Sequence, residues 1–190
     1  SWVAKGAFLI TGFGAVLALL ILDVYIGLGE FIALKLMGLV FALLSSVYTA
    51  FLLAQAKGRD LWLSHLAPFQ MVIHAMLAGG AAMALLTGEI TRELAFTMSG
   101  FLLFNLGIFA IELTSSRLTD DARTAAQMIL KGRYAKHFWA SVLVGRVVPL
   151  IILFTGLNTI PLWIVMAVLL AGILVTEHIW IRAPQLIALS

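Results

Sequence analysis

The sequence contains no cysteine and few charged residues. Without thiols the chain forms no disulfide, no thiolate zinc site and no cysteine-ligated iron–sulfur cluster of its own. Charged residues make up only 11% of the chain and hydrophobic residues 63%, whereas a soluble domain has about 25% and about 45–50%. A soluble chain of this length cannot bury so much apolar surface. We therefore interpret the sequence as a helical membrane protein, because lipid is itself an apolar solvent.

Long apolar segments dominate the chain, and six of them approach the roughly 20 residues that a helix needs to cross a bilayer. Their residues are continuously apolar and do not alternate with polar ones, which argues against a membrane barrel. We expect spanning helices over residues 2–28, 31–56, 66–87, 93–115, 138–156 and 160–181. Pro149 lies inside the fifth of these and is expected to kink it, since proline cannot donate a backbone hydrogen bond.

One long polar segment, residues 117–136, separates the fourth and fifth spans. Thr119 can cap a helix whose first turn carries Asp120 and Asp121, which suit the positive end of a helix. Its apolar residues recur at helical spacing: Ala122, Ala125, Ala126, Ile129 and Leu130. We predict an amphipathic helix on the membrane surface here. The expected fold is an all-α transmembrane bundle of about six spanning helices plus this surface helix, in a single domain over residues 1–190.

The charged residues divide between the two sides of this predicted bundle. The polar segments 57–65 and 117–136 share one side with Lys5 and Arg182. The opposite side has two basic residues against four acidic ones: Lys35 and Arg92, and Asp23, Glu30, Glu89 and Glu93. The positive-inside rule would place the basic side in the cytoplasm.

Ionisable groups within the spans are costly in lipid and are therefore candidates for function. At a rise of about 1.5 Å per residue, Tyr48 and His74 lie at matched depths, about 13 Å below the basic loops. A phenol and an imidazole can hold the two oxygens of a quinone, and a histidine can relay protons near neutral pH. The alternative is that each side chain only hydrogen-bonds a backbone carbonyl.

Glu112 and Arg146 are two further ionisable residues inside predicted spans. A guanidinium in mid-membrane must be paired or must face water, so we assign both residues to a candidate proton path. The alternative is a static ion pair between them, across the hairpin of the fourth and fifth spans.

The four histidines provide no clear pair of haem ligands. A membrane haem needs two axial ligands from facing helices, and only His74 lies well inside a span, whereas His65, His137 and His178 lie near its ends. We predict neither haem nor metal in this chain. No nucleophilic triad, phosphate-binding loop or metalloprotease motif is present, and we expect lipid and not nucleic acid as a contact.

Three stretches, in order along the chain, together resemble one known family: VYTAFLLAQAKGRDLW (47–62), the segment from IELTSSRLTDDARTAAQ to GRVVPL (111–150), and EHIWIRAPQLIALS (177–190). They resemble the NrfD/polysulfide reductase family of PsrC-like quinone-interacting membrane subunits, which also occurs in alternative complex III. The opening SWVAKGAFL resembles the entry to an internal helix of the same family. That family usually has eight or more spans, so we expect this chain to be part of a longer subunit.

The resemblance implies a multi-pass anchor in the bacterial cytoplasmic membrane that binds menaquinone or ubiquinone and holds no cofactor of its own. Its expected partners are an iron–sulfur electron-transfer subunit and a larger catalytic or multihaem cytochrome subunit. Tyr48 matches a tyrosine of the family, and we group it with His74 and Gln55 as quinone contacts. The expected docking edge for the iron–sulfur subunit comprises Lys57, Arg59, Asp60 and Trp62.

Several alternatives stay open at this point. In many relatives the partner is periplasmic, which would place the basic side outside and conflicts with the positive-inside rule. The chain can also be read as a transporter or channel, as a purely structural anchor, or as a haem b quinol dehydrogenase subunit. Whether it is itself an enzyme is not determined by the sequence.

Overall fold

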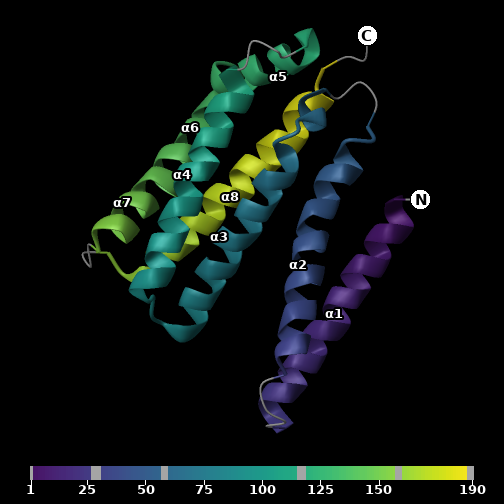
Figure 1. The fold of residues 1–190 in the computed structure, drawn as a ribbon. Coiled ribbons are helices and arrows are strands. Elements are labelled where there is room, and N and C mark those ends of the chain that lie inside the picture. Colours follow the sequence, from purple (N-terminus) through teal and green to yellow (C-terminus); the bar gives the residue numbers. More distant parts are fainter. Residues whose placement is uncertain (1, 27–30, 57–59, 115–118, 157–159, 188–190) are drawn as a thin grey trace.

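The computed structural model describes residues 2–26, 31–56, 60–114, 119–156 and 160–187, and within these ranges the chain forms helices and no strand. The elements, shown in Figure 1, are α1 (Trp2–Ile26), α2 (Ile32–Leu53), η1 (Asp60–Leu63), α3 (Ala67–Thr87), α4 (Arg92–Thr114), α5 (Asp120–Leu130), α6 (Ala135–Val142), η2 (Leu143–Val147), α7 (Val148–Thr155) and α8 (Leu162–Gln185). This arrangement confirms the predicted all-α fold class.

Six helices in the described ranges are long and apolar enough to cross a membrane. They are α1, α2, α3, α4, the continuous run α6–η2–α7, and α8. Each overlaps one of the six predicted spans, and the chain is therefore a multi-pass membrane protein.

Two of these spans extend further towards the basic side than the sequence predicts. The fifth begins at Ala135 instead of residue 138, and the sixth continues to Gln185 instead of residue 181. The predicted bounds follow hydropathy, which falls at the first polar side chains. The backbone, however, stays helical through the polar turn at the start of the fifth span and at the end of the sixth. Arg182 lies in the last turn of α8, where a cation suits the negative end of a helix.

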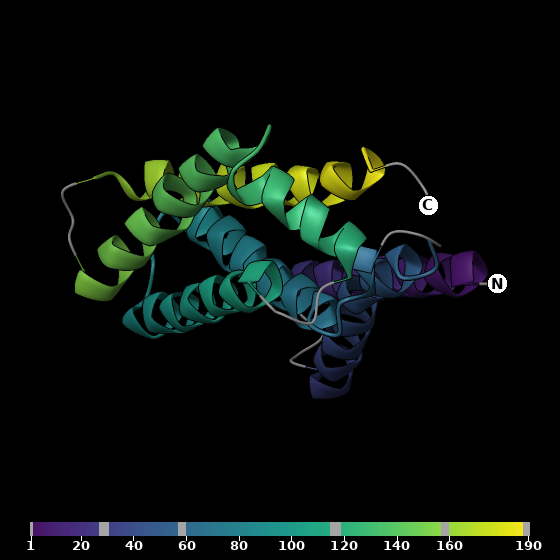
Figure 2. The ribbon, with the colours of Figure 1, turned by 90° about the horizontal axis from the view of Figure 1, so that it is seen from above.

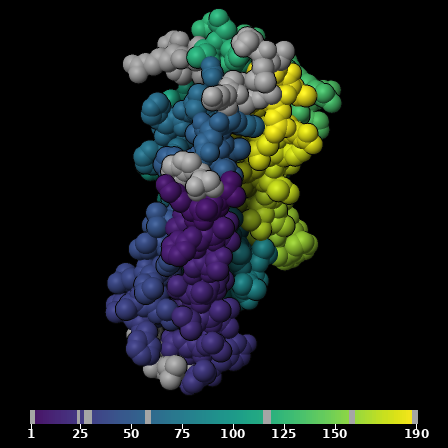
Figure 3. Space-filling model, turned by 90° about the vertical axis from the view of Figure 1, so that its right-hand side faces the viewer, coloured from purple at the N-terminus to yellow at the C-terminus, as the bar shows by residue number. Residues whose placement is uncertain are grey.

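The helices form a four-membered bundle with a separate hairpin beside it. α3 and α4 pack together on one side, and α6–η2–α7 and α8 pack together on the other, as the view from above illustrates (Figure 2). The α1–α2 hairpin contacts the bundle through α2 and α3. α1 lies on the outside of the molecule over α2 (Figure 3), and most of its large apolar side chains are exposed.

The short helix α5 crosses one end of the bundle and contacts η1, α4, α6 and α8. The hydroxyl of Thr119 accepts a hydrogen bond from the backbone N–H of Ala122, as predicted for the cap. The apolar face of α5 is buried in a cluster with Leu61, Phe109 and Trp180. This face comprises Ala122, Ala125, Ala126 and Ile129. We call this end of the bundle the basic end, because Lys131, Arg133, Lys136 and Arg182 lie there.

The fifth span is irregular around its middle. η2 is a π-turn, in which the backbone N–H of Val148 bonds to the carbonyl of Leu143. Pro149 follows at once and cannot donate a hydrogen bond to the preceding turn, so the predicted irregularity lies just before the proline. Next to it, Gly145 and Gly172 let η2 and α8 approach backbone to backbone, as small residues do in membrane helices.

Replacing Gly172 with alanine should weaken this contact. The new Cβ would lie 2.6 Å from the Cα of Gly145, and a backbone atom cannot move aside as a flexible side chain can. We expect the free energy of unfolding in mixed micelles to fall by about 1–3 kcal/mol. The matched control is Gly107→Ala on α4, where a Cβ meets nothing within 4 Å; an equal loss in both variants would contradict this explanation.

Candidate functional site

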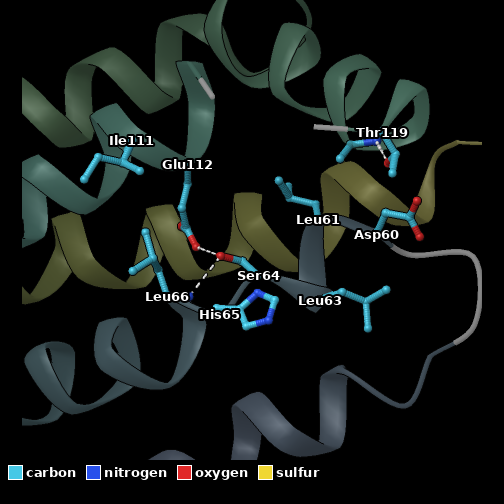
Figure 4. Close-up of a pocket in the computed structure, with 10 residues that line it drawn as sticks. Asp60, Leu61, Leu63, Ser64, His65, Leu66, Ile111, Glu112 and Thr119 are labelled. Atoms are coloured by element: carbon cyan, nitrogen blue, oxygen red, sulfur yellow. Dashed lines mark hydrogen bonds between the residues drawn. The ribbon is translucent and has the colours of Figure 1, made fainter. Parts of the chain in front are cut away.

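A pocket of about 370 Å³ lies at the basic end, beneath η1 and α5. Its walls come from η1, residues 64–66 that lead into α3, the end of α4 and the start of α5 (Figure 4). Most of the exposed lining surface is apolar, although the two kinds of side chain are equal in number. The apolar side chains are Leu61, Leu63, Leu66, Ile111 and Ala122, and the polar ones are Asp60, Ser64, His65, Glu112 and Thr119. A mainly apolar cleft with a few polar groups is the usual character of a small-molecule site.

Glu112 is the buried charged group of this pocket, with 4% of its surface exposed. The Ser64 hydroxyl donates to its Oε1 and accepts from the backbone N–H of Leu66, which fixes the hydroxyl between the two (Figure 4). The second carboxyl oxygen, Oε2, is buried and has no hydrogen-bond partner in the part of the chain that the structure describes. Such an oxygen calls for a donor from water or from a ligand.

A second polar group lies inside the bundle and links three helices. His74 on α3 is 4% exposed, and its Nδ1 lies 2.5 Å from Oε1 of Glu177 on α8. Its Nε2 lies 2.9 Å from the amide nitrogen of Asn105 on α4. Both ring nitrogens therefore have side-chain partners from neighbouring helices. The alternative from the sequence, in which His74 only hydrogen-bonds a backbone carbonyl, does not describe this arrangement.

Arg146 on η2 is fully buried and is surrounded by acceptors. Its Nε donates to Oδ1 of Asn105 at 2.6 Å, and one terminal nitrogen donates to the hydroxyl of Thr176 at 2.5 Å. The other terminal nitrogen reaches the carbonyls of Ser141 and Gly172 at 3.3 and 3.2 Å. The guanidinium also lies 4.9 Å from the ring centre of Phe109, a distance suited to a cation–π contact.

The two residues predicted for a proton path belong to different groups. Glu112 bonds to Ser64, and the hydrogen bonds of Arg146 go to Asn105, Thr176 and carbonyls. The ion pair between them, raised as an alternative from the sequence, does not form. Phe109 lies between the groups along α4, with its ring against both His74 and Arg146.

Tyr48 and His74, predicted to share a pocket, also belong to separate groups. Tyr48 is 9% exposed, and its ring packs so closely on Gly6 of α1 that a Cβ there would overlap the phenol. It lines none of the four pockets described in this section. The partners of His74 come instead from α4 and α8. Gln55 is exposed just after the end of α2.

The predicted docking edge is described only in part, because Lys57 and Arg59 lie outside the described residues. Asp60 begins η1 and is half-buried. Trp62 is buried at 7% exposure, and its indole N–H donates to the carbonyl of Trp180 at 3.0 Å. Trp62 therefore joins η1 to the last turns of α8.

Further pockets open on the surface of the described residues. One of about 790 Å³ lies at the opposite end, around Gly88, Phe96 and Gly156. One of about 570 Å³ lies between the start of α6 and α8, beside His137 and His178, and one of about 500 Å³ lies along α1 beside Lys5. Within the described ranges, no group of three histidine, aspartate or glutamate side chains is placed to hold a metal ion.

Sequence reasoning missed Asn105, Thr176 and Ser64 as members of these groups. A signal was available for Asn105, since an amide in the middle of an apolar span usually bonds to another helix. Gln70, one turn before His74, carries the same signal: it is 3% exposed and its Oε1 has no partner in the described ranges. Threonine and serine carry less information, because their hydroxyls often bond within their own helix.

Comparison of the chain with protein families, with curated proteins and with solved structures finds no match. The resemblance to the NrfD/polysulfide reductase family therefore stays a prediction from the quoted stretches.

Replacing Arg146 with lysine should destabilise the bundle although the charge is kept. Lysine lacks the planar donor array of arginine and has no counterpart of the Nε–H that reaches Asn105. A hydrogen bond to a charged group contributes about 1.5–3 kcal/mol, so we expect a loss of about that size in the free energy of unfolding. Arg92→Lys, at an exposed position, is the control, and similar stability of the two variants would contradict the assignment.

Proposed function

We propose that this protein is a quinone- or quinol-interacting membrane subunit of an oxidoreductase complex in the bacterial cytoplasmic membrane. One observation carries the proposal. Glu112 lies at the edge of the pocket beneath η1, with one carboxyl oxygen held by Ser64 and the other buried without a partner in the described chain.

The chemistry of a quinone suits this carboxyl group. A quinol hydroxyl can donate to a carboxylate oxygen, and a quinone carbonyl can accept from a carboxylic acid. Either form would therefore satisfy the oxygen that the fold leaves unpaired. The leucine and isoleucine side chains around it offer an apolar wall for a ring.

Three polar residues of the pocket would then have separate tasks. Ser64 holds the carboxyl group in one orientation, because its own hydroxyl is fixed by Leu66. Glu112 exchanges a proton with the bound molecule. His65 is exposed at the pocket rim and can pass that proton to water near neutral pH. A bound quinone supplies the two-electron, two-proton redox step.

The remaining parts of the proposal rest on the resemblance. Electrons would be exchanged with an iron–sulfur subunit docked over the segment 57–62, itself attached to a larger catalytic or multihaem cytochrome subunit. Tyr48 would be a second quinone contact in a pocket completed by a neighbouring helix. The positive-inside rule would place the basic end in the cytoplasm, whereas the partner in many relatives of the resembled family is periplasmic. The proposal is compatible with either orientation.

Replacing Glu112 with leucine should weaken quinone binding, because leucine can neither donate to a quinone carbonyl nor accept from a quinol hydroxyl, whereas the NH₂ of glutamine could still donate to the carbonyl. The probe is menadione, followed by quenching of tryptophan fluorescence in the purified protein, where Trp62 lies on η1 beside the pocket. We expect saturable quenching in the parent and about tenfold weaker binding in Glu112→Leu, since about 1.4 kcal/mol of hydrogen bonding is lost.

The control is Glu89→Leu, at an exposed position near the opposite end of the bundle. Parent-like binding in Glu112→Leu would remove Glu112 from the site. Absence of saturable quenching in the parent would leave the purely structural anchor as the better account, and substrate flux into liposomes without any redox partner would favour a transporter.

Replacing Tyr48 with phenylalanine tests the contact that the resemblance implies. The ring keeps its packing on Gly6, so the complex should still assemble with its native neighbours. Loss of one hydrogen bond of about 1 kcal/mol should lower menadiol-linked turnover about fivefold. Tyr25→Phe, at an exposed position of α1, is the control; unchanged turnover in Tyr48→Phe would exclude the phenol from the site.

A further inference from the structure

The buried group around His74 contains a chain of hydrogen bonds whose directions can be worked out. Arginine has five N–H donors and no acceptor. Because Nε of Arg146 must donate, the atom of Asn105 that faces it at 2.6 Å must be the amide oxygen. The amide NH₂ of Asn105 is then turned the other way, towards α3.

That amide determines the tautomer of His74. The NH₂ group can only donate, and it lies 2.9 Å from Nε2 of the imidazole. Nε2 must therefore accept and carries no proton. The single proton of the neutral ring lies on Nδ1, where it donates to the Glu177 carboxylate at 2.5 Å.

The same constraint decides where an additional proton can reside. A doubly protonated imidazole would place its Nε2–H against the Asn105 NH₂, donor against donor. Rotating the amide to relieve that contact would place its NH₂ against Nε–H of Arg146. An added proton must therefore bind to Glu177, whose side chain is 29% exposed, whereas the His74 side chain is 5% exposed.

We propose that His74 and Glu177 form a membrane-embedded proton-binding site. It takes up and releases protons only through the Glu177 carboxyl group, and Asn105 and Arg146 are the residues that position it. Proton transfer along these hydrogen bonds stops at His74, because the Asn105 amide, which donates from its NH₂, does not take up a proton and pass it on. A proton that enters at Glu177 leaves by the same carboxyl group. Arg146 therefore acts through Asn105 and is not a stage on a path across the membrane, which differs from its predicted role.

The surroundings of His74 agree with this assignment. Its hydrogen bonds lead to two charged groups, Glu177 on α8 and, beyond Asn105, Arg146 on η2. Phe109 on α4 lies edge-on to the imidazole, with ring centres 6.3 Å apart, and adds no donor or acceptor. The inference does not require a quinone and stands or falls independently of the proposed function.

Nitrogen NMR of the imidazole tests the tautomer directly. His65, His137 and His178 are all exposed, so changing these three to glutamine leaves His74 as the only histidine in the chain. The full chain, labelled with ¹³C and ¹⁵N in histidine and placed in lipid nanodiscs at neutral pH, should give one protonated and one bare ring nitrogen. The protonated one should correlate with Cγ, which identifies it as Nδ1.

Two changes at Asn105 should alter that spectrum in different ways. In Asn105→Asp the carboxylate accepts from Arg146 and from Nε2–H, so both ring nitrogens should be protonated. In Asn105→Leu the donor to Nε2 is absent, whereas the Glu177 carboxylate still holds the Nδ1 proton. Only the Nε2 resonance should therefore move, towards that of a bare nitrogen without a hydrogen bond. Glu177→Gln keeps an acceptor oxygen for Nδ1–H and should retain the parent spectrum.

Infrared difference spectra between mildly alkaline and mildly acidic buffer test where the added proton binds. A carboxylic acid band present in the parent should vanish in Glu177→Gln and persist in the exposed control Glu89→Gln. A proton on Nε2 in the parent would overturn the proposal, as would a parent spectrum unchanged in Asn105→Asp or Asn105→Leu. The leucine variant and the parent decide the outcome if the aspartate variant does not fold.

Discussion

Lipid offers no hydrogen bonds, and the buried guanidinium of Arg146 is the group on which this constraint acts most strongly. Its partners come from α4, from the α6–η2 segment and from α8, so satisfying one side chain fixes the relative positions of three spans. The bundle is thereby specified by polar contacts as well as by apolar packing, which in lipid discriminates poorly between helices.

The backbone around Arg146 is adapted to that role. The glycine pair at positions 145 and 172 brings α8 close enough for the Gly172 carbonyl to accept from the guanidinium. Arg146 fixes the orientation of the Asn105 amide, whose NH₂ then faces Nε2 of His74, and the other ring nitrogen of His74 faces Glu177. In contrast, the pocket around Glu112 has an unsatisfied carboxyl oxygen. One polar group is therefore internally complete, and the other is suited to an outside molecule.

Much of the fold could be predicted because helix length and capping are local properties. Six apolar runs predict six spans, and Thr119 followed by two aspartates predicts the start of α5. The site could be predicted only in part. Arg146 and Asn105 are far apart in sequence, and their contact depends on which faces of two helices meet, which depth along a span does not reveal. The same holds for the Trp62 indole, which the sequence placed in the expected docking edge and which bonds to the backbone of α8.

The π-turn at η2 also restricts how the chain can change its length. Each residue of an α-helix adds about 100° of rotation and about 1.5 Å of rise. The wider turn thus offsets the face of α7 from that of α6, which brings Pro149 and Leu153 into the interior. Deleting one residue from 143–147 would restore a regular helix and rotate both away from the core. A single-residue gap aligned here in any related chain would consequently indicate a differently organised interior.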